Sequence, residues 1–319
     1  MKFFYLVPAL FCMHQVLFSD VKHLELEAGA TPWARQHLPM TTLAYETIGT
    51  TTAPVISAQK VAKINQWAPG LFARAAILPT EKFGLEARYL GLLEWKKVYA
   101  ISTTGTSLTY SLQISPTTPI SFTGASQVIE DYRMKYESGD LLFLWNMAPL
   151  YDKFFGVRAL VGPSYIYLMD ELDQTLSSAT YLKQYTIEAT NHFIGARGYA
   201  EIIGTPAPFI WGLRGSFGVY ADVYRQRSTV SQSIPLSSSS NYVFYATNSW
   251  PSTLLQGDVY LGINLFDRLR IKGAFGIESL NYLGSALTQP GLAFTKKGIY
   301  RKNHFLFYGG NVSIELDLF

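Results

Sequence analysis

Eight charged residues stand on the polar side of segments in which apolar and polar residues alternate. They are Glu86, Arg88, Arg158, Arg214, Asp222, Asp258, Lys272 and Glu278. Successive side chains of a strand point to opposite faces, so alternation gathers the charges of such a segment on one face. In a narrow barrel, arginines and carboxylates on facing walls can pair across the interior, or they can select ions. These residues therefore predict either an ion-selective lumen or a lumen closed by paired charges.

Histidine is the residue on which a catalytic site would have to be built. Four histidines follow residue 20, namely His23, His37, His192 and His304. A hydrolase of the Ser/His or Asp/His type needs a nucleophile beside an oriented base. Nothing in the sequence fixes such a nucleophile, and no close histidine spacing supports a metal site. We expect no enzyme activity, cofactor or metal, and keep a membrane-embedded hydrolase using His192 or His304 as the catalytic alternative.

The alternation also predicts the elements that hold these charges. In LLQGDVYLGINLFDRLRIKGAFGIE, residues 254–278, apolar and polar residues alternate on both sides of Asp267 and Arg268. Strands with the same pattern are expected at 83–95, 209–227 and 311–319, and weaker ones at 21–31, 69–78, 127–147, 154–170 and 183–203. The total is about ten strands.

Residues 127–147 depart from strict alternation. Tyr132, Met134 and Tyr136 share one face of the expected strand, whereas the apolar residues from Leu141 onward share the other. A change of parity within one strand is typical of an inserted residue. We therefore predict a β-bulge near Gly139.

Short and long connections alternate along the chain. Tight joins are expected at 79–81, 148–153, 204–207 and 267–268, and longer ones at 32–66, 97–126, 171–182, 226–253 and 283–303. Antiparallel strands with all short turns at one end give this order, as in outer-membrane barrels, whereas Greek-key sandwiches do not. The Ser-rich segment 228–243 is expected to be a mobile loop. Segments 47–57 and 101–115 are expected to form hairpins beyond a membrane or one more strand pair.

The composition and the first residues favour an exported protein in lipid. Charged residues make up 15% of the chain and aromatic residues 15%, whereas soluble domains have roughly 25% charged residues. No run approaches the ~18 apolar residues of a membrane-spanning helix. Lys2 and the apolar stretch behind it predict a signal peptide over residues 1–19. The net charge is only +3 and the basic residues are scattered along the chain, which argues against a nucleic-acid partner.

Together these patterns predict an all-β fold in a single domain, residues 20–319. It is a transmembrane antiparallel up-and-down β-barrel of about ten strands, within a range of 8–12, with long external loops. A secreted soluble β protein is the alternative. The expected location is the bacterial outer membrane, with its lipid and the barrel-assembly machinery as partners. The strand ending in Phe319 would carry the assembly signal, although Glu315 and Asp317 occupy two of its apolar places.

Seven stretches resemble one family of proteins. They are FGLEARYLGLLE, YRMKYESGDLLFLWNM, FFGVRALVGPSYIYLMDEL, YTIEATNHFIGARGYAEI, WGLRGSFGVYADVYRQR, QGDVYLGINLFDRLRIKGAFGIESLNYLGSAL and FYGGNVSIELDLF. In this order they resemble the outer-membrane β-barrel porin family of planctomycetes and chlamydia-like bacteria, similar to Legionella-type pore-forming outer-membrane proteins. The opening HLELEAGATPWARQ departs from the Trp-rich first strand of that family. The resemblance implies a Gram-negative-type outer membrane and a pore role.

The number of strands limits the width of a pore. Eight strands leave an interior filled by side chains, and open aqueous channels come at about 16 to 18 strands. With about ten strands we expect a narrow pore-forming, porin-like protein that passes small ions or solutes. The alternative is a non-conducting surface barrel whose external loops act in adhesion or partner recognition.

Overall fold

The computed structural model describes most of the chain. The described residues are 23–36, 42–48, 51–57, 66–102, 107–115, 118–148, 155–178, 181–234, 237–266, 268–284 and 303–318. The predicted signal peptide, His37 and Phe319 lie outside these ranges. Within them, no helix is both long enough and apolar enough to cross a membrane.

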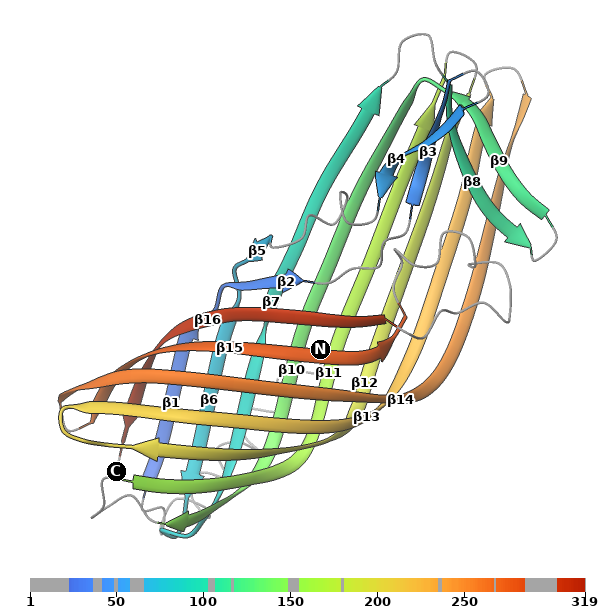
Figure 1. Ribbon diagram of the computed structural model, residues 1–319. Helices are drawn as coiled ribbons and strands as arrows, with labels where there is room; N and C mark the ends of the chain where they lie inside the picture. The colour runs from blue at the N-terminus through green and yellow to red at the C-terminus, as the bar shows by residue number, and fades with distance from the viewer. Residues whose placement is uncertain are drawn as a thin grey trace, which may run out of the picture.

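Ten antiparallel strands close a ring (Figure 1). In ring order they are β1 (His23–Ala30), β6 (Leu71–Leu78), β7 (Phe83–Ser102), β10 (Gln127–Ala148), β11 (Phe155–Ser177), β12 (Leu182–Gly204), β13 (Phe209–Ile234), β14 (Ser237–Phe266), β15 (Leu269–Leu283) and β16 (Asn303–Asp317). Two short strands extend this sheet. The strand β2 (Trp33–Gln36) follows β1 and pairs with β16, and β5 (Trp67–Ala68) precedes β6 and pairs with β2. The structure therefore confirms the predicted antiparallel up-and-down barrel of about ten strands.

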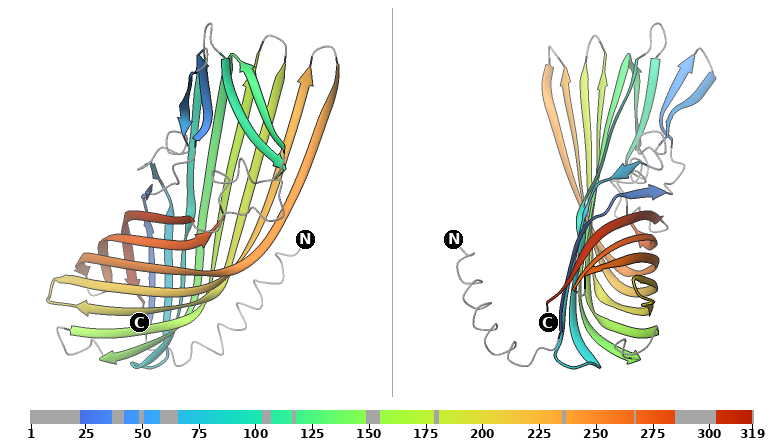
Figure 2. Two further views of the ribbon diagram at one scale, coloured as in Figure 1. Left: turned by 45° about the vertical axis from the view of Figure 1, so that its right-hand side comes forward. Right: turned by 90° about the vertical axis from the view of Figure 1, so that its left-hand side faces the viewer.

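The connections between these strands differ at the two ends of the ring. The strands β6, β10, β12, β14 and β16 all finish at one end of the ring, which we call the short-turn end (Figure 2). At the opposite end β7 and β10 to β14 continue well beyond the ring as one curved sheet. Among the described strands, β14 here pairs with β13 alone over residues 237–252, because its pairing with β15 starts at Thr253. We call this part the extension.

Most of the expected long connections are strand rather than loop. The prediction of a mobile loop at 228–243 was wrong, because β13 runs to Ile234 and pairs with β14 up to Ser237. Ser and Thr are compatible with strands when both backbone edges find partners, and residues 229–232 pair with both β12 and β14. Segments 47–57 and 101–115 contribute to two hairpins, β3 (Thr42–Ile48) with β4 (Thr51–Ser57) and β8 (Ser107–Ser115) with β9 (Thr118–Ala125), which pair in a separate sheet.

The outer surface of the ring carries an apolar belt. Large exposed residues of the belt include Leu85, Leu141, Phe143, Val161, Ile194, Leu213, Phe217, Val259, Leu261, Phe275 and Ile314. On β11 and β13 the belt covers residues 155–165 and 209–219, eleven residues on each strand. A tilted membrane-spanning strand has about 9–11 residues. The ring therefore has the surface of a membrane-spanning barrel.

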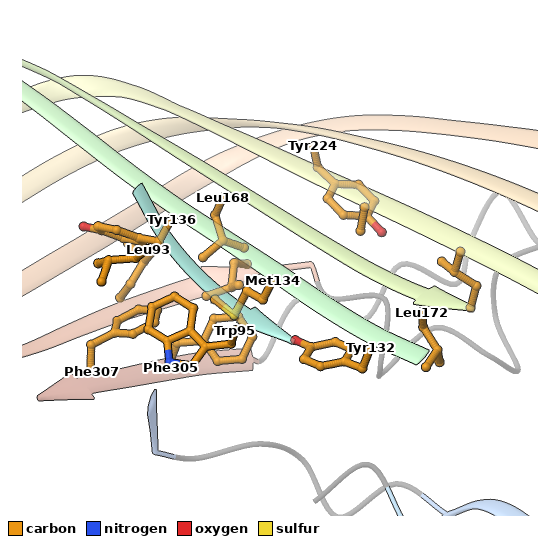
Figure 3. Packing of buried hydrophobic residues seen from close by; sticks show 14 of the residues in the cluster. Leu93, Trp95, Tyr132, Met134, Tyr136, Leu168, Leu172, Tyr224, Phe305 and Phe307 are labelled. Carbon is orange, nitrogen blue, oxygen red and sulfur yellow. The ribbon is translucent and has the colours of Figure 1, made fainter. Parts of the chain in front are cut away.

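Apolar side chains change sides where the belt ends. In the belt β10 exposes Leu141 and Phe143, whereas above the belt it buries Tyr132, Met134 and Tyr136 (Figure 3). Burial on β10 nevertheless falls on even-numbered residues throughout, and its pairing with β11 is continuous across residues 138–140. The parity change therefore reflects a change of surroundings, from lipid to water outside the barrel.

The β-bulge lies on β7 and not on β10, so the prediction of a bulge near Gly139 was wrong. Between Tyr136 and Ser138 of β10 the register with β7 shifts by one residue, and Leu92 has a φ of 60°. The extra residue turns Leu85 outward but Trp95 inward. The two therefore do not share a face, as strict alternation over 83–95 predicted.

Replacing Leu213 in the middle of the belt by arginine tests the lipid contact. We expect Leu213→Arg to lower the free energy of unfolding by about 2–4 kcal/mol, because the guanidinium would face hydrocarbon. Urea titrations of the protein in lipid vesicles, followed by tryptophan fluorescence, measure this quantity. Tyr245→Arg is the matched control, since Tyr245 is 74% exposed in the extension. Equal losses in both variants would contradict the assignment of the belt.

Candidate functional site: the charged lumen

The eight charged residues predicted from alternation all point into the barrel. Seven of them, Glu86, Arg88, Arg158, Arg214, Asp258, Lys272 and Glu278, lie at the level of the belt. Asp222 is separate from them. It is fully buried above the charged level, opposite Phe193 of β12 and Trp250 of β14 in the strand register. Neither carboxylate oxygen has a hydrogen-bond partner within the described ranges. That these residues line a conducting path stays a prediction.

Arg74 of β6 is the centre of the network near the short-turn end. Its guanidinium lies 2.6 Å from Glu25, 2.9 Å from Glu86, 3.4 Å from Glu315 and 3.7 Å from Glu27. These carboxylates come from β1, β7 and β16, so one side chain joins four neighbouring strands. All five side chains are at most 8% exposed. Burial of four carboxylates is tolerable only because cations stand among them.

Two more cations complete this part of the network. Lys272 of β15 contacts Glu315 and lies 3.6 Å from Glu27. Arg270 Nη1 lies 2.5 Å from the other oxygen of Glu315. Each carboxylate here is therefore shared between cations from different strands. The closing seam between β1 and β16 is thus held by ion pairs as well as by its backbone pairing.

Arg197 of β12 organises a second network farther from the short-turn end. It lies 3.3 Å from Glu278 and 3.8 Å from Asp140. The Tyr199 hydroxyl donates to Asp140 at 2.5 Å, and the guanidinium carbons of Arg88 and Arg197 lie 4.3 Å and 4.8 Å from the Tyr199 ring centroid. Both arginines therefore contact the same aromatic ring. Such cation–π contacts are stronger where water is displaced.

A hydrogen bond crosses the whole lumen above Arg197. The Tyr136 hydroxyl donates to Glu278 at 2.5 Å. Tyr136 belongs to β10 and Glu278 to β15, five places apart in the ring of ten strands. The two residues therefore come from opposite walls. The bond closes the upper boundary of the charged lumen.

A layer of aromatic rings fills the barrel above this bond. We call Trp95, Tyr132, Tyr136, Phe305 and Phe307 the aromatic seal (Figure 3). Each is at most 1% exposed. The Phe307 ring centroid lies 5.2 Å from that of Tyr136, 5.7 Å from that of Trp95 and 6.0 Å from that of Phe305. These rings belong to β7, β10 and β16, so the seal spans the interior.

Arg35 inserts a buried cation into the aromatic seal. Its Nη1 donates to the Tyr132 hydroxyl at 2.7 Å, and its guanidinium carbon lies 4.9 Å from the Tyr132 ring centroid. The same carbon lies 5.9 Å from the Trp95 centroid and 6.0 Å from that of Phe305. The cation is therefore surrounded by ring faces and strengthens the packing of the seal.

The lumen is widest near the short-turn end. A cavity of about 240 Å³ lies there, which we call the vestibule, and its lining includes Arg74, Arg158, Glu201, Arg214 and Lys272. A smaller cavity of about 50 Å³ lies nearer the seal and is lined in part by Arg88, Arg197 and Tyr199. The interior thus narrows from the vestibule to the aromatic seal.

Sequence reasoning missed several members of these networks. Arg74 and Glu25 lie in segments expected to be weak strands, and Arg197 lies in a less regular one. The same alternation could have identified them, because each stands at an inward position between outward small or apolar residues. The role of Tyr136 had no such signal, since a tyrosine is common on either face of a strand.

Among the described residues, His23 borders the charged lumen beside Asp317, whereas His192 and His304 lie outside it. His192 is on the outer surface of β12, with Nδ1 2.8 Å from the Tyr165 hydroxyl and its ring centroid 5.4 Å from that of Tyr167. His23 Nδ1 lies 3.8 Å from an Asp317 oxygen, and His304 is exposed. In the described part of the chain, no three His, Cys, Asp or Glu residues are placed to hold a metal ion. The absence of enzyme activity stays a prediction.

Comparison with known proteins finds likeness in structure only. Neither a family model nor a curated protein matches the sequence. Outer membrane protease OmpT from Escherichia coli aligns over 93% of this chain and 97% of its own, at 9% identity and a TM-score of 0.40. The translocator domain of autotransporter NalP from Neisseria meningitidis aligns over 98% of this chain and 94% of its own, at 10% identity and a TM-score of 0.35. A FadL homologue of Pseudomonas aeruginosa aligns over 94% of this chain and 91% of its own, at 8% identity and a TM-score of 0.24. At these values the likenesses carry no argument about function, and the porin family stays a prediction.

Replacing Arg74 tests whether the ion pairs hold the barrel together. We expect Arg74→Gln to lower the free energy of unfolding by about 3–5 kcal/mol, because it leaves buried carboxylates without a cation. Urea titration in lipid vesicles measures the loss. Arg133→Gln is the control: Arg133 is paired with Glu94 at 3.3 Å, but its side chain is 37% exposed, so about 1 kcal/mol or less is expected. A loss no larger than in the control would show that the network does not stabilise the fold.

Proposed function

We propose that this protein is a bacterial outer-membrane barrel that does not conduct in the described state and that presents its extension to partners outside the cell. The aromatic seal carries the proposal. Five large side chains, each at most 1% exposed, meet across a ring of ten strands, and so few strands leave little interior beyond what side chains fill. An ion entering from the vestibule would meet packed rings above Glu278.

The outer-membrane location is supported by the surface of the ring. The belt has the length of a membrane-spanning strand, and short turns gather at one end as in barrels of that membrane. By the same analogy the short-turn end faces the periplasm. The assembly machinery is proposed as a partner of β16, which turns Val312, Ile314 and Leu316 toward lipid.

The extension supplies the surface for recognition. Residues 237–252 of β14 lie beyond the ring, and sixteen residues of strand extend by roughly 50 Å. Its outer face carries charged residues such as Lys96, Arg133 and Glu171. A paired sheet presents such side chains at fixed positions, which reduces the entropy lost on binding.

A narrow pore is the second candidate function. The vestibule favours it, because a cavity of about 240 Å³ with charged walls could admit small ions. The resemblance to the porin family points the same way. Conduction would require the aromatic rings to move apart. The two candidates therefore differ in whether the unmodified barrel passes current.

Current recordings in planar lipid bilayers separate these candidates. We expect residues 20–319 to insert without discrete current steps. The double variant Tyr136→Ala/Phe307→Ala should give steps, because it removes two rings from the seal, and adding Arg214→Glu should shift the ion selectivity of the opened form. The matched control, Phe143→Ala/Phe217→Ala, removes two exposed rings of the belt and should stay silent. Steps from the unmodified protein would contradict the proposal and favour the pore.

A further inference from the structure

The vestibule has two unlike walls. On the wall formed by β1, β6, β15 and β16, the cations Arg74, Arg270 and Lys272 each lie within ion-pair distance of at least two carboxylates. On the wall formed by β11 to β14, the cations Arg158 and Arg214 each have one such partner within the described ranges. The second wall therefore keeps hydrogen-bonding capacity that the first has used.

The unused hydrogen-bonding capacity of the second wall belongs to the guanidinium groups of Arg158 and Arg214. Arg158 reaches Glu25 through Nη2 at 3.2 Å, and its Nε is buried without a hydrogen-bond partner among the described residues. Arg214 reaches Asp258 through Nε at 3.0 Å, and neither of its terminal nitrogens forms an ion pair with a carboxylate in the part of the chain that the structure describes. A buried donor without a partner lowers the stability of the fold. A ligand that accepts hydrogen bonds from these groups would recover part of that cost.

Glu201 stands between the two arginines. The strand register pairs Arg158 with Glu201 across β11 and β12, and Glu201 with Arg214 across β12 and β13. Side chains paired in this way have Cβ atoms about 5 Å apart. Glu201 is 6% exposed and, among the described residues, forms no ion pair or hydrogen bond with either neighbour. The wall thus presents a row of positive, negative and positive groups to the cavity.

Such a row selects the charge pattern of its ligand. A simple anion would be attracted by the two guanidinium groups but repelled by Glu201 between them. A simple cation would be attracted by Glu201 but repelled by the two guanidinium groups. A small molecule with a carboxylate and an ammonium group complements all three side chains, because arginine forks bind carboxylates and Glu201 accepts from an ammonium.

We propose that the vestibule binds a small zwitterion of amino-acid size, with its carboxylate held by Arg158 and Arg214 and its ammonium group by Glu201. The cavity of about 240 Å³ is large enough for such a ligand. One water molecule needs roughly 10–15 Å³ of cavity volume measured in this way, and a small amino acid has only a few times as many non-hydrogen atoms. This site lies below the aromatic seal and is reached from the short-turn end. It goes beyond the proposed function, because binding here requires neither conduction nor a partner at the extension.

Isothermal titration calorimetry on the refolded full chain in detergent tests the site. Glycine is the probe, with acetate and methylammonium as its two charged halves. We expect saturable binding of glycine and at least tenfold weaker binding of either half, because each half leaves one charge type unpaired. Arg158→Gln, Arg214→Gln and Glu201→Gln should each weaken glycine binding at least tenfold. Arg133→Gln, outside the lumen, should leave it unchanged.

Several outcomes would overturn the site. Acetate binding as tightly as glycine, or glycine binding untouched by Glu201→Gln, would mean an anion site without the proposed role of Glu201. No saturable heat from folded unmodified protein would mean that no such site exists. Heat-dependent migration on gels verifies that each sample is folded, and the comparison of the three probes needs no variant. Because bilayer current tests the seal separately, failure here is distinguishable from failure of the proposed function.

Discussion

Every strand of this barrel has two faces, and the medium outside decides which one is apolar. In the belt the outer medium is lipid, so apolar residues such as Leu213 and Leu261 face outward and polar residues face the lumen. In the extension the outer face carries charges, and the apolar face turns inward as Tyr132, Met134 and Leu172. One change of surroundings along continuous strands therefore produces both a charged lumen and an aromatic seal above it.

The buried charges of the lumen need partners of opposite charge, because an unpaired buried charge is strongly destabilising. Arg74 and Arg197 meet this requirement in different ways. Arg74 draws together carboxylates from β1, β7 and β16 around the closing seam. Arg197 reaches across the interior to Glu278 and shares the Tyr199 ring with Arg88. Side chains that neutralise one another in this way also tie opposite walls together, so the network that makes the lumen polar also narrows it.

The interior of the barrel is closed on one side by the aromatic seal and widens into the vestibule on the other side. Its closed side is the aromatic seal, where Tyr136 hydrogen-bonds to Glu278 from the opposite wall. Its wide side is the vestibule, where Arg158, Glu201 and Arg214 are less completely paired than the residues around Arg74. Recognition by the extension and binding in the vestibule would thus take place on opposite sides of the membrane. Packed rings separate the two surfaces, so the two proposed functions would be independent of each other.

Alternation by itself determined the strand type, the approximate number of strands and the inward direction of charges such as Glu86, Arg214 and Glu278, because a period of two is a local property of the chain. It did not determine what lies outside each face. For that reason the parity change in 127–147 was misinterpreted as a bulge. The Ser-rich segment 228–243 was misinterpreted as a loop, although residues 229–232 pair with strands on both sides. Only the closed ring decided that Arg74 meets four carboxylates and that Tyr136 faces Glu278, because these contacts join residues far apart in sequence. Their pairing depends on ring order and register, which no single strand encodes.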